Sequence, residues 1–227
     1  MIARLIAATA LLALVLGIAG QATAGEPFRE FPPPQGKGRV VVIASGMSGP
    51  DHYAAAAKAI AALGYDAVLF DGNPMEGTHG AGLLSAIESA KSAPHGLPGK
   101  VALVGFSLGG GIVLYYGSQH PELAVGVVAW YPATAVIRNV PDYASRIQTP
   151  VVMFAGGADN YRDGCCLAAK AQVIATAAAA AGKSFTLTVY PGVDHDFVID
   201  GSHYDRAAYD DAMRRTAAAL TSFFAQP

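Results

Sequence analysis

The sequence has few charged residues and no cluster of basic ones. Of its 227 residues, 15 are Lys or Arg and 17 are Asp or Glu, so the formal net charge is −2. A protein that follows a nucleic-acid backbone needs clustered Lys and Arg side chains. The near-neutral balance therefore argues against a nucleic-acid partner. The sequence also has no internal repeat, low-complexity tract or heptad pattern, so nothing indicates a repeat protein or a coiled coil.

Cysteine is equally scarce. The chain has two cysteines, Cys165 and Cys166, and they are adjacent. Neighbouring Cα atoms lie about 3.8 Å apart, below the usual range for a disulfide. We therefore expect two buried free thiols rather than a vicinal disulfide, because free cysteine is among the most often buried residue types. No group of His, Cys, Asp or Glu has the spacing of zinc ligands, so no metal site is expected.

The first 24 residues differ from the rest of the chain. Arg4 precedes an apolar segment at 5–18, and Ala22-Thr23-Ala24 follows with the small residues of a cleavage site. This pattern predicts a secretory signal peptide cleaved after Ala24, and a periplasmic or secreted protein. A membrane anchor is the alternative, but the apolar segment is shorter than the ~20 residues of a spanning helix. The residue directly after the cleavage site is not a cysteine, which argues against a lipoprotein anchor.

Residues 25–227 are long enough for a single domain with a sizeable core. Apolar, β-branched segments alternate along them with helix-compatible segments, which predicts βαβ units and a mainly parallel sheet of about six to seven strands with helices on both faces. The proline-rich segment 25–38 has room for one edge strand at most. We expect strands at 39–44, 66–70, 101–106, 123–130, 151–154 and 185–190, and helices at 51–63, 77–92, 108–118, 142–146, 167–181 and 206–225.

The strongest chemical signal is the segment Gly105-Phe106-Ser107-Leu108-Gly109, between the strand at 101–106 and the helix that follows it. A serine in this pattern, at a strand-to-helix turn, is a candidate nucleophile because the cramped turn lifts its hydroxyl clear of the sheet. A tight turn with a capping serine is the alternative. The context favours the nucleophile.

A serine nucleophile needs a base within hydrogen-bond reach and a third group that orients the base. His195 lies in the loop after the last strand, and Asp159 follows the strand at 151–154. Loops at the carboxyl ends of parallel strands share one edge of the sheet, so we predict that Ser107, His195 and Asp159 form a catalytic triad. Other aspartates nearby in the sequence remain alternatives for the acid: Asp163, Asp194 and Asp196.

Two backbone N–H groups are candidates for an oxyanion hole. Leu108 directly follows the nucleophile, and Met47 lies in the loop after the first parallel strand. Substitution of a side chain does not remove such a donor, so Met47→Ala should matter much less than Ser107→Ala. His52 begins the next helix and could line the pocket, although we expect an exposed or capping histidine there.

Together these segments resemble the dienelactone hydrolase family, within the α/β-hydrolase fold. The resemblance spans most of residues 25–227, and its segments are 40–44, 64–68, 104–110, 190–197 and 209–216. It implies an α/β-hydrolase fold, with Ser107, Asp159 and His195 at the triad positions. It also places Met47 and Leu108 at the oxyanion positions.

The chain departs from the family pattern at two positions. Named dienelactone hydrolases have a cysteine nucleophile where this chain has Ser107, and Ile199 stands where one of their carboxylate-binding arginines would fall. Dienelactone itself is therefore not the expected substrate. The connection between Trp130 and Val151 is too short for a large cap domain, which indicates an open site and small or flexible esters.

The sequence thus predicts a serine hydrolase that cleaves small-molecule carboxylic esters or lactones through an acyl-enzyme. It requires no cofactor, and no stable membrane anchor remains after signal removal. An acyltransferase or thioesterase would use the same residues. A non-catalytic exported binding protein is the alternative from another class, because a fold does not by itself imply an activity. The sequence leaves open the substrate, the acyl-chain preference and the oligomeric state.

Overall fold

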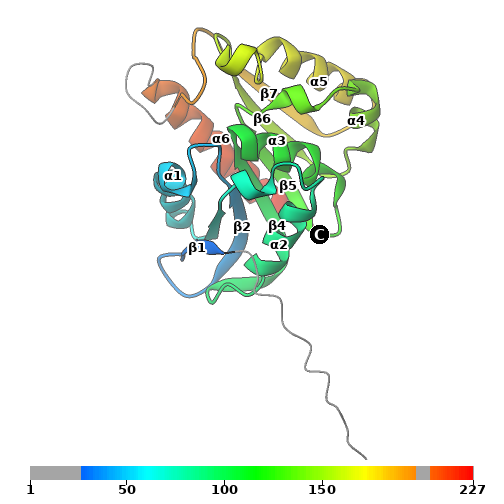
Figure 1. Cartoon of the computed structure of the whole chain (residues 1–227). Helices are drawn as coiled ribbons and strands as arrows, with labels where there is room; N and C mark the ends of the chain where they lie inside the picture. Colours follow the sequence, from blue (N-terminus) through cyan, green and yellow to red (C-terminus); the bar gives the residue numbers. More distant parts are fainter. Residues whose placement is uncertain (1–26, 198–204, 227) are drawn as a thin grey trace, which may run out of the picture.

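The computed structural model describes residues 27–197 and 205–226, which form one seven-stranded sheet with helices packed around it (Figure 1). The expected signal peptide and Ile199 lie outside the described residues. The strands are β1 (Phe28–Phe31), β2 (Gly38–Ala44), β3 (Asp66–Phe70), β4 (Gly96–Phe106), β5 (Ala124–Trp130), β6 (Val151–Gly156) and β7 (Phe185–Tyr190). The α-helices are α1 (Pro50–Ala62), α2 (Ala81–Ala90), α3 (Ser107–Tyr115), α4 (Val140–Arg146), α5 (Ala168–Ala180) and α6 (Arg206–Phe224). Short 3-10 helices are η1 (Asn73–Met75), η2 (Gly117–Gln119), η3 (Thr134–Val136) and η4 (Tyr161–Asp163).

The sheet has the strand order β1-β3-β2-β4-β5-β6-β7. The edge strand β1 pairs antiparallel with β3, and every other pair is parallel. The predicted α/β-hydrolase architecture is confirmed, with a mainly parallel sheet and helices on both faces. Between β5 and β6 the structure holds η3 and α4 but no large cap.

The alternation of side chains along β2 shows how the two faces are covered. Val40, Val42 and Ala44 pack in a core with residues of α2, α3, α4 and α5, while Val41 and Ile43 pack in a second core with residues of α1 and α6. Successive side chains of a strand point to opposite faces, so a strand buried on both faces needs a continuous apolar sequence. This explains the uninterrupted apolar segments of the parallel strands.

Two elements differ most from their predicted bounds, and the other elements differ by smaller shifts at their ends. The helix expected at 77–92 is limited to α2 (Ala81–Ala90), because Gly77, His79 and Gly80 have positive φ angles that a right-handed helix does not admit. The strand expected at 101–106 begins earlier, at Gly96, where its first residues pair with Gly38 and Arg39 of β2. Proline and glycine in this segment are poor strand formers, so only the pairing partner extends the strand.

The parallel strands bring several loops to one edge of the sheet. Ser107 follows the carboxyl end of β4, Tyr131 follows β5, Gly157 follows β6 and Pro191 follows β7. Ligands of open α/β sheets bind outside this edge. Within the part of the chain that the structure describes, no helix has both the length and the apolar character needed to cross a membrane.

Candidate active site

Ser107 lies at a sharp turn between β4 and α3. It is the first residue of α3 and has a φ of 51°, whereas Phe106 before it is extended, with φ −118° and ψ 132°. A positive φ is unusual for a residue with a side chain and carries a cost of about 1–3 kcal/mol. The surrounding structure therefore has to hold this turn in place, as expected for a nucleophile elbow.

The two glycines that flank Ser107 permit a close approach of backbone segments. A Cβ atom on Gly109 would lie 2.3 Å from the carbonyl oxygen of Ala44 and 2.5 Å from that of Ser45. A Cβ atom on Gly105 would lie 2.4 Å from the carbonyl oxygen of Gly109. These contacts are with backbone atoms, which cannot swing aside, so both positions require glycine.

A continuous chain of hydrogen bonds joins the three predicted triad residues. The Ser107 Oγ lies 2.9 Å from His195 Nε2, and His195 Nδ1 lies 2.7 Å from Asp159 Oδ2. The Asp159 side chain is fully buried and that of His195 is 10% exposed. The backbone N–H of Tyr161 donates to the other Asp159 oxygen at 3.0 Å, which holds the carboxylate in place. Loops that are far apart in the sequence thus bring a hydroxyl, an imidazole and a carboxylate into one hydrogen-bonded chain.

The alternative acids have other positions. Asp194 Oδ1 accepts a hydrogen bond from the backbone N–H of His195 at 2.7 Å, and Asp196 contacts His52 and Tyr131. Asp163 is the last residue of η4. The contact to His195 Nδ1 is made by Asp159, which makes Asp159 the aspartate placed to orient the imidazole.

A second polar cluster lies beside this chain. The two Asp196 carboxylate oxygens contact His52 Nε2 at 2.9 Å and the Tyr131 hydroxyl at 3.0 Å. The His52 side chain is 16% exposed, so the expectation of an exposed or capping histidine is wrong. Burial above all, and then the neighbouring Tyr53 and Asp196, raises the pKa of Tyr131. The Tyr131 phenol therefore stays protonated and donates to Asp196.

Two tyrosine rings hold the imidazole of His195. The Tyr161 ring stacks on it with ring centroids 4.4 Å apart and an interplanar angle of 3°, and the Tyr131 ring meets it edge-on at 5.0 Å and 72°. Neither tyrosine was among the residues predicted for the site. Their positions in the sequence could have indicated them, because Tyr131 directly follows β5 and Tyr161 lies two residues after Asp159.

Among the residues that the structure describes, neither candidate oxyanion amide, that of Met47 or that of Leu108, donates to a backbone carbonyl. The Leu108 N–H belongs to the first turn of α3, where helical amides have no partner within the helix. Among the described residues, no backbone carbonyl accepts a hydrogen bond from the Met47 N–H. The Met47 carbonyl accepts one from Asn73 Nδ2 at 3.3 Å, which ties this loop to η1.

A cavity of about 350 Å³ opens over these groups, a volume in the range of small-molecule sites. Ser107 and His195 lie in its wall, and no Lys or Arg is among its lining residues in the part of the chain described. The remaining lining residues are Met47, Ser48, Tyr53, Ala158, Asn160, Tyr161, Asp194 and Asp196.

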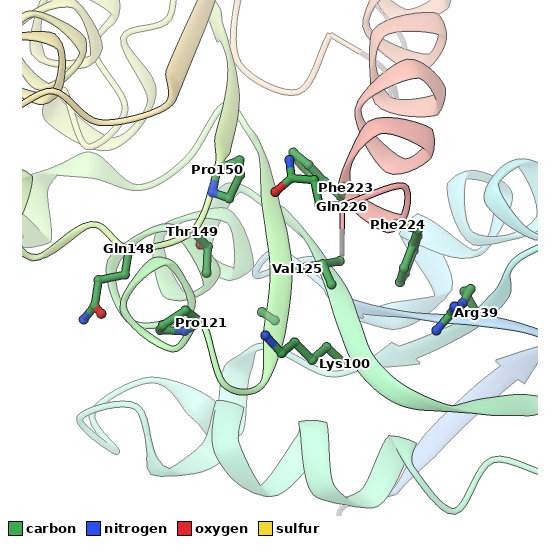
Figure 2. Close-up of a pocket in the computed structure, with 11 residues that line it drawn as sticks. Arg39, Lys100, Pro121, Val125, Gln148, Thr149, Pro150, Phe223, Phe224 and Gln226 are labelled. Atoms are coloured by element: carbon green, nitrogen blue, oxygen red, sulfur yellow. The ribbon is translucent and has the colours of Figure 1, made fainter.

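A larger hollow, of about 520 Å³, lies at the opposite edge of the sheet, where the parallel strands begin. Figure 2 shows the residues that line it. Its walls include Arg39 near the start of β2, Pro150 just before β6 and Phe223 near the end of α6. The predicted triad residues and oxyanion donors do not line it. Size alone therefore does not identify the reaction site.

Cys165 and Cys166 form a disulfide with each other, so the expectation of free thiols is wrong. That expectation relied on the usual range of Cα–Cα distances in disulfides, and this pair is bonded although its Cα atoms are only 3.8 Å apart. The surrounding backbone holds the pair in place. The Cys165 N–H donates to the Tyr161 carbonyl at 3.1 Å, and the Cys165 carbonyl accepts from the Ala135 N–H at 3.0 Å.

The disulfide also affects the possibility of a metal site. Donor atoms of Asp159, Cys166 and His195 all lie within 4.8 Å of one another. A cysteine binds a metal as a thiolate, and the Cys166 sulfur is bonded to Cys165. In this state the three residues do not form a suitable ligand set, and two of them are already hydrogen-bonded to each other.

Comparisons with known proteins identify the family and the fold of the chain. A model of the dienelactone hydrolase family matches residues 73–226, which is more than half of the chain. The fold is similar to that of a protein from Klebsiella pneumoniae described as a dienelactone hydrolase, with 21% identity, a TM-score of 0.72, and 88% of this chain and 93% of that chain covered. It is also similar to Est1E from Butyrivibrio proteoclasticus, with 14% identity, a TM-score of 0.69, and coverage of 88% and 94%.

A third similar structure is an esterase from the Planctomycetes species Thermogutta terrifontis, with 18% identity, a TM-score of 0.66, and 86% of each chain covered. At these identities the structures show a shared fold. A search of curated proteins found no match. The family match nevertheless covers α3, β5, β6, β7 and α6, with the loops between them. The chain belongs to the dienelactone hydrolase family of the α/β-hydrolase superfamily and is a hydrolase that acts on esters.

Proposed function

We propose that this protein cleaves carboxylic esters or lactones through an acyl-enzyme on Ser107. The observation that carries the proposal is the hydrogen-bonded chain from Ser107 Oγ to His195 Nε2 at 2.9 Å and from His195 Nδ1 to Asp159 Oδ2 at 2.7 Å. A serine hydroxyl is a weak nucleophile until a base removes its proton. The base here is His195, which the buried carboxylate of Asp159 orients.

The reaction follows from this arrangement. As Ser107 Oγ attacks the ester carbonyl, its proton passes to His195 Nε2, and the carbonyl oxygen becomes an oxyanion that accepts hydrogen bonds from the Met47 and Leu108 amides. His195 then returns the proton to the leaving alcohol, and the acyl group stays on Ser107. Water then gives a proton to His195 as it attacks the acyl carbon. The bond between the acyl group and Ser107 Oγ breaks, the acid leaves, and His195 returns the proton to Ser107 Oγ. The Asp159 carboxylate stabilises the imidazolium in both steps.

The substrate in this proposal is a small molecule. The cavity over Ser107 has a volume of about 350 Å³, and no large cap covers it in residues 27–197 and 205–226. All the groups of the mechanism are side chains and amides of the chain itself, so the proposed reaction uses no cofactor.

The test is covalent labelling of the mature protein with a fluorophosphonate, which reacts with activated serines. We expect one adduct per chain, mapped by mass spectrometry to Ser107 and lost in Ser107→Ala. Ser48 lines the same cavity, so Ser48→Ala is the matched control and keeps the adduct. A folded protein that takes up no label would refute the proposal.

We also propose that the protein is exported, to the periplasm or out of the cell, after cleavage behind Ala24. The support is the order of Arg4, the apolar segment at 5–18 and the small residues Ala22-Thr23-Ala24. In a cell that expresses the full chain, the soluble exported fraction should hold a protein that begins at Gly25. A chain that keeps Met1 and stays in the membrane fraction would contradict the proposal.

A further inference from the structure

A second cavity, of about 450 Å³, begins at the residue after the nucleophile. Leu108 connects it to the site: its amide is a candidate oxyanion donor, and its side chain lines the cavity. Other apolar walls come from Met75 in η1, Ile112 in α3 and Val136 in η3. Leu108, Met75 and Ile112 are almost wholly buried, whereas Val136 is 54% exposed.

The direction of the proposed reaction assigns the two ends of an ester to the two cavities. His195 Nε2 has to give its proton to the leaving oxygen, so the alcohol part lies beside His195, in the cavity with Asp194 and Asp196. The carbonyl oxygen points toward the amides of Met47 and Leu108. The third substituent of the carbonyl carbon is the acyl chain, which has to extend away from His195. The second cavity is lined by Leu108, the residue that follows Ser107 in the chain.

We propose that the cavity lined by Leu108, Met75, Ile112 and Val136 is an acyl groove that binds an extended apolar acyl chain. The inference rests on the proposed acyl-enzyme at Ser107 and adds the class of substrate, which is esters of medium-chain carboxylic acids. The charged residues of the groove, Glu76 and Arg138, are exposed. The volume of the groove is within the usual range of ligand pockets, and an acyl chain would cover the exposed side chain of Val136.

The test compares two p-nitrophenyl esters, the octanoate and the acetate, which share one leaving group. Each methylene that leaves water raises kcat/KM by up to about fourfold, so the octanoate should be hydrolysed with the higher kcat/KM. Val136→Trp fills the groove and should lower the octanoate-to-acetate ratio of kcat/KM by about tenfold or more. The matched control is Val173→Trp on α5, because Val173 is 55% exposed and lines neither cavity. The control should keep the ratio of the parent protein.

A second measurement separates the groove from the nucleophile. Methyl octanoate added to Ser107→Ala protein should shift the methyl NMR signals of Ile112 and Val136, whether or not Ser107 is the nucleophile. Shifts without ester turnover by the parent protein would support the groove and refute the proposed function. Equal kcat/KM for both esters, equal effects of the two tryptophan substitutions, or no shift at Ile112 and Val136 would overturn the groove.

Discussion

At the scale of single residues, the site is built on backbone conformations that side chains normally avoid. Ser107, Tyr131 and Asp196 have φ angles of 51°, 34° and 57°, and each such conformation costs about 1–3 kcal/mol. Specific contacts hold them. The Ser107 carbonyl accepts from Ala133 at 2.9 Å, the Tyr131 N–H donates to Phe154 at 2.8 Å, and the Tyr131 hydroxyl donates to Asp196. Strained residues of this kind gather at functional sites, and here they surround His195.

The role of Asp159 can be separated from that of Asp194. Asp159→Asn should lower kcat for ester hydrolysis by roughly 10³–10⁴-fold, because an amide cannot hold the tautomer that accepts the serine proton. Asp194→Asn should lower kcat by less than about tenfold, because the asparagine oxygen still accepts from the His195 N–H, a neutral hydrogen bond of about 1 kcal/mol. Steady-state hydrolysis of one ester by both variants is the measurement. The opposite ranking would make Asp194 the acid.

At the scale of elements, the edge strand β1 brings a second carboxylate to the start of β3. Asp66 is fully buried, and neither of its carboxylate oxygens has a hydrogen-bond partner among the described residues. Burial above all, and then the Glu30 carboxylate of β1, raises the pKa of Asp66 to about 6. Glu30 itself accepts hydrogen bonds from the backbone N–H and the ring of His95, at 2.9 and 3.1 Å. The edge strand β1 thus places Glu30 close to Asp66, and both this neighbour and burial disfavour the charged form of Asp66.

The stability of the fold should therefore depend on the protonation of Asp66. In the unfolded chain its pKa is about 3.9, so the folded state binds the proton more tightly, and the stabilisation present below pH 4 is lost as pH rises through about 6. Asp66→Asn removes this dependence. Between pH 4.5 and 7.5, the free energy of unfolding of the variant relative to the parent should rise by about 1–2 kcal/mol. Urea denaturation at both pH values measures it, and a difference that does not change with pH would contradict the assignment.

At the scale of the whole molecule, the parallel strands end at a carboxyl edge of the sheet and begin at an amino edge, and the two edges carry different features. The carboxyl edge carries Ser107, Asp159 and His195 on three loops, whereas the amino edge holds the larger hollow (Figure 2). Arg39 and Lys100 line this hollow together with residues at the end of α6, where the helix dipole is negative. The Arg39 guanidinium lies over the Phe224 ring, 5.9 Å from its centroid. This edge contributes packing around the terminal helix.

Substitutions at the amino edge should leave catalysis nearly unchanged. Lys100→Ala and Gln148→Ala alter exposed side chains of the larger hollow, and exposed substitutions away from special features change free energies by about 0.5 kcal/mol or less. Ester kcat/KM should therefore stay within about twofold of the parent value. A loss of more than about tenfold in either variant would link this edge to the reaction.

Much of the fold was predictable because its signals are local. The apolar run of β2 and the segment around Ser107 can be read in a few neighbouring residues, and the position of a loop after a strand indicates the edge at which it lies. The same reasoning placed His195 and Asp159 beside Ser107. It failed at residues 77–80, where left-handed backbone at His79 and Gly80 delays the start of α2.

The sequence by itself determined the order of strands and helices, the parallel sheet and the loops from which the candidate triad comes. Only the tertiary structure decided what touches those residues. His52 and Asp196 meet although 144 positions separate them, and Tyr161, the first residue of η4, stacks on His195. Periodicity reports which face of its own element a side chain occupies. Contacts between loops, and the cavities beside Ser107, depend on distances that arise only when the elements pack together.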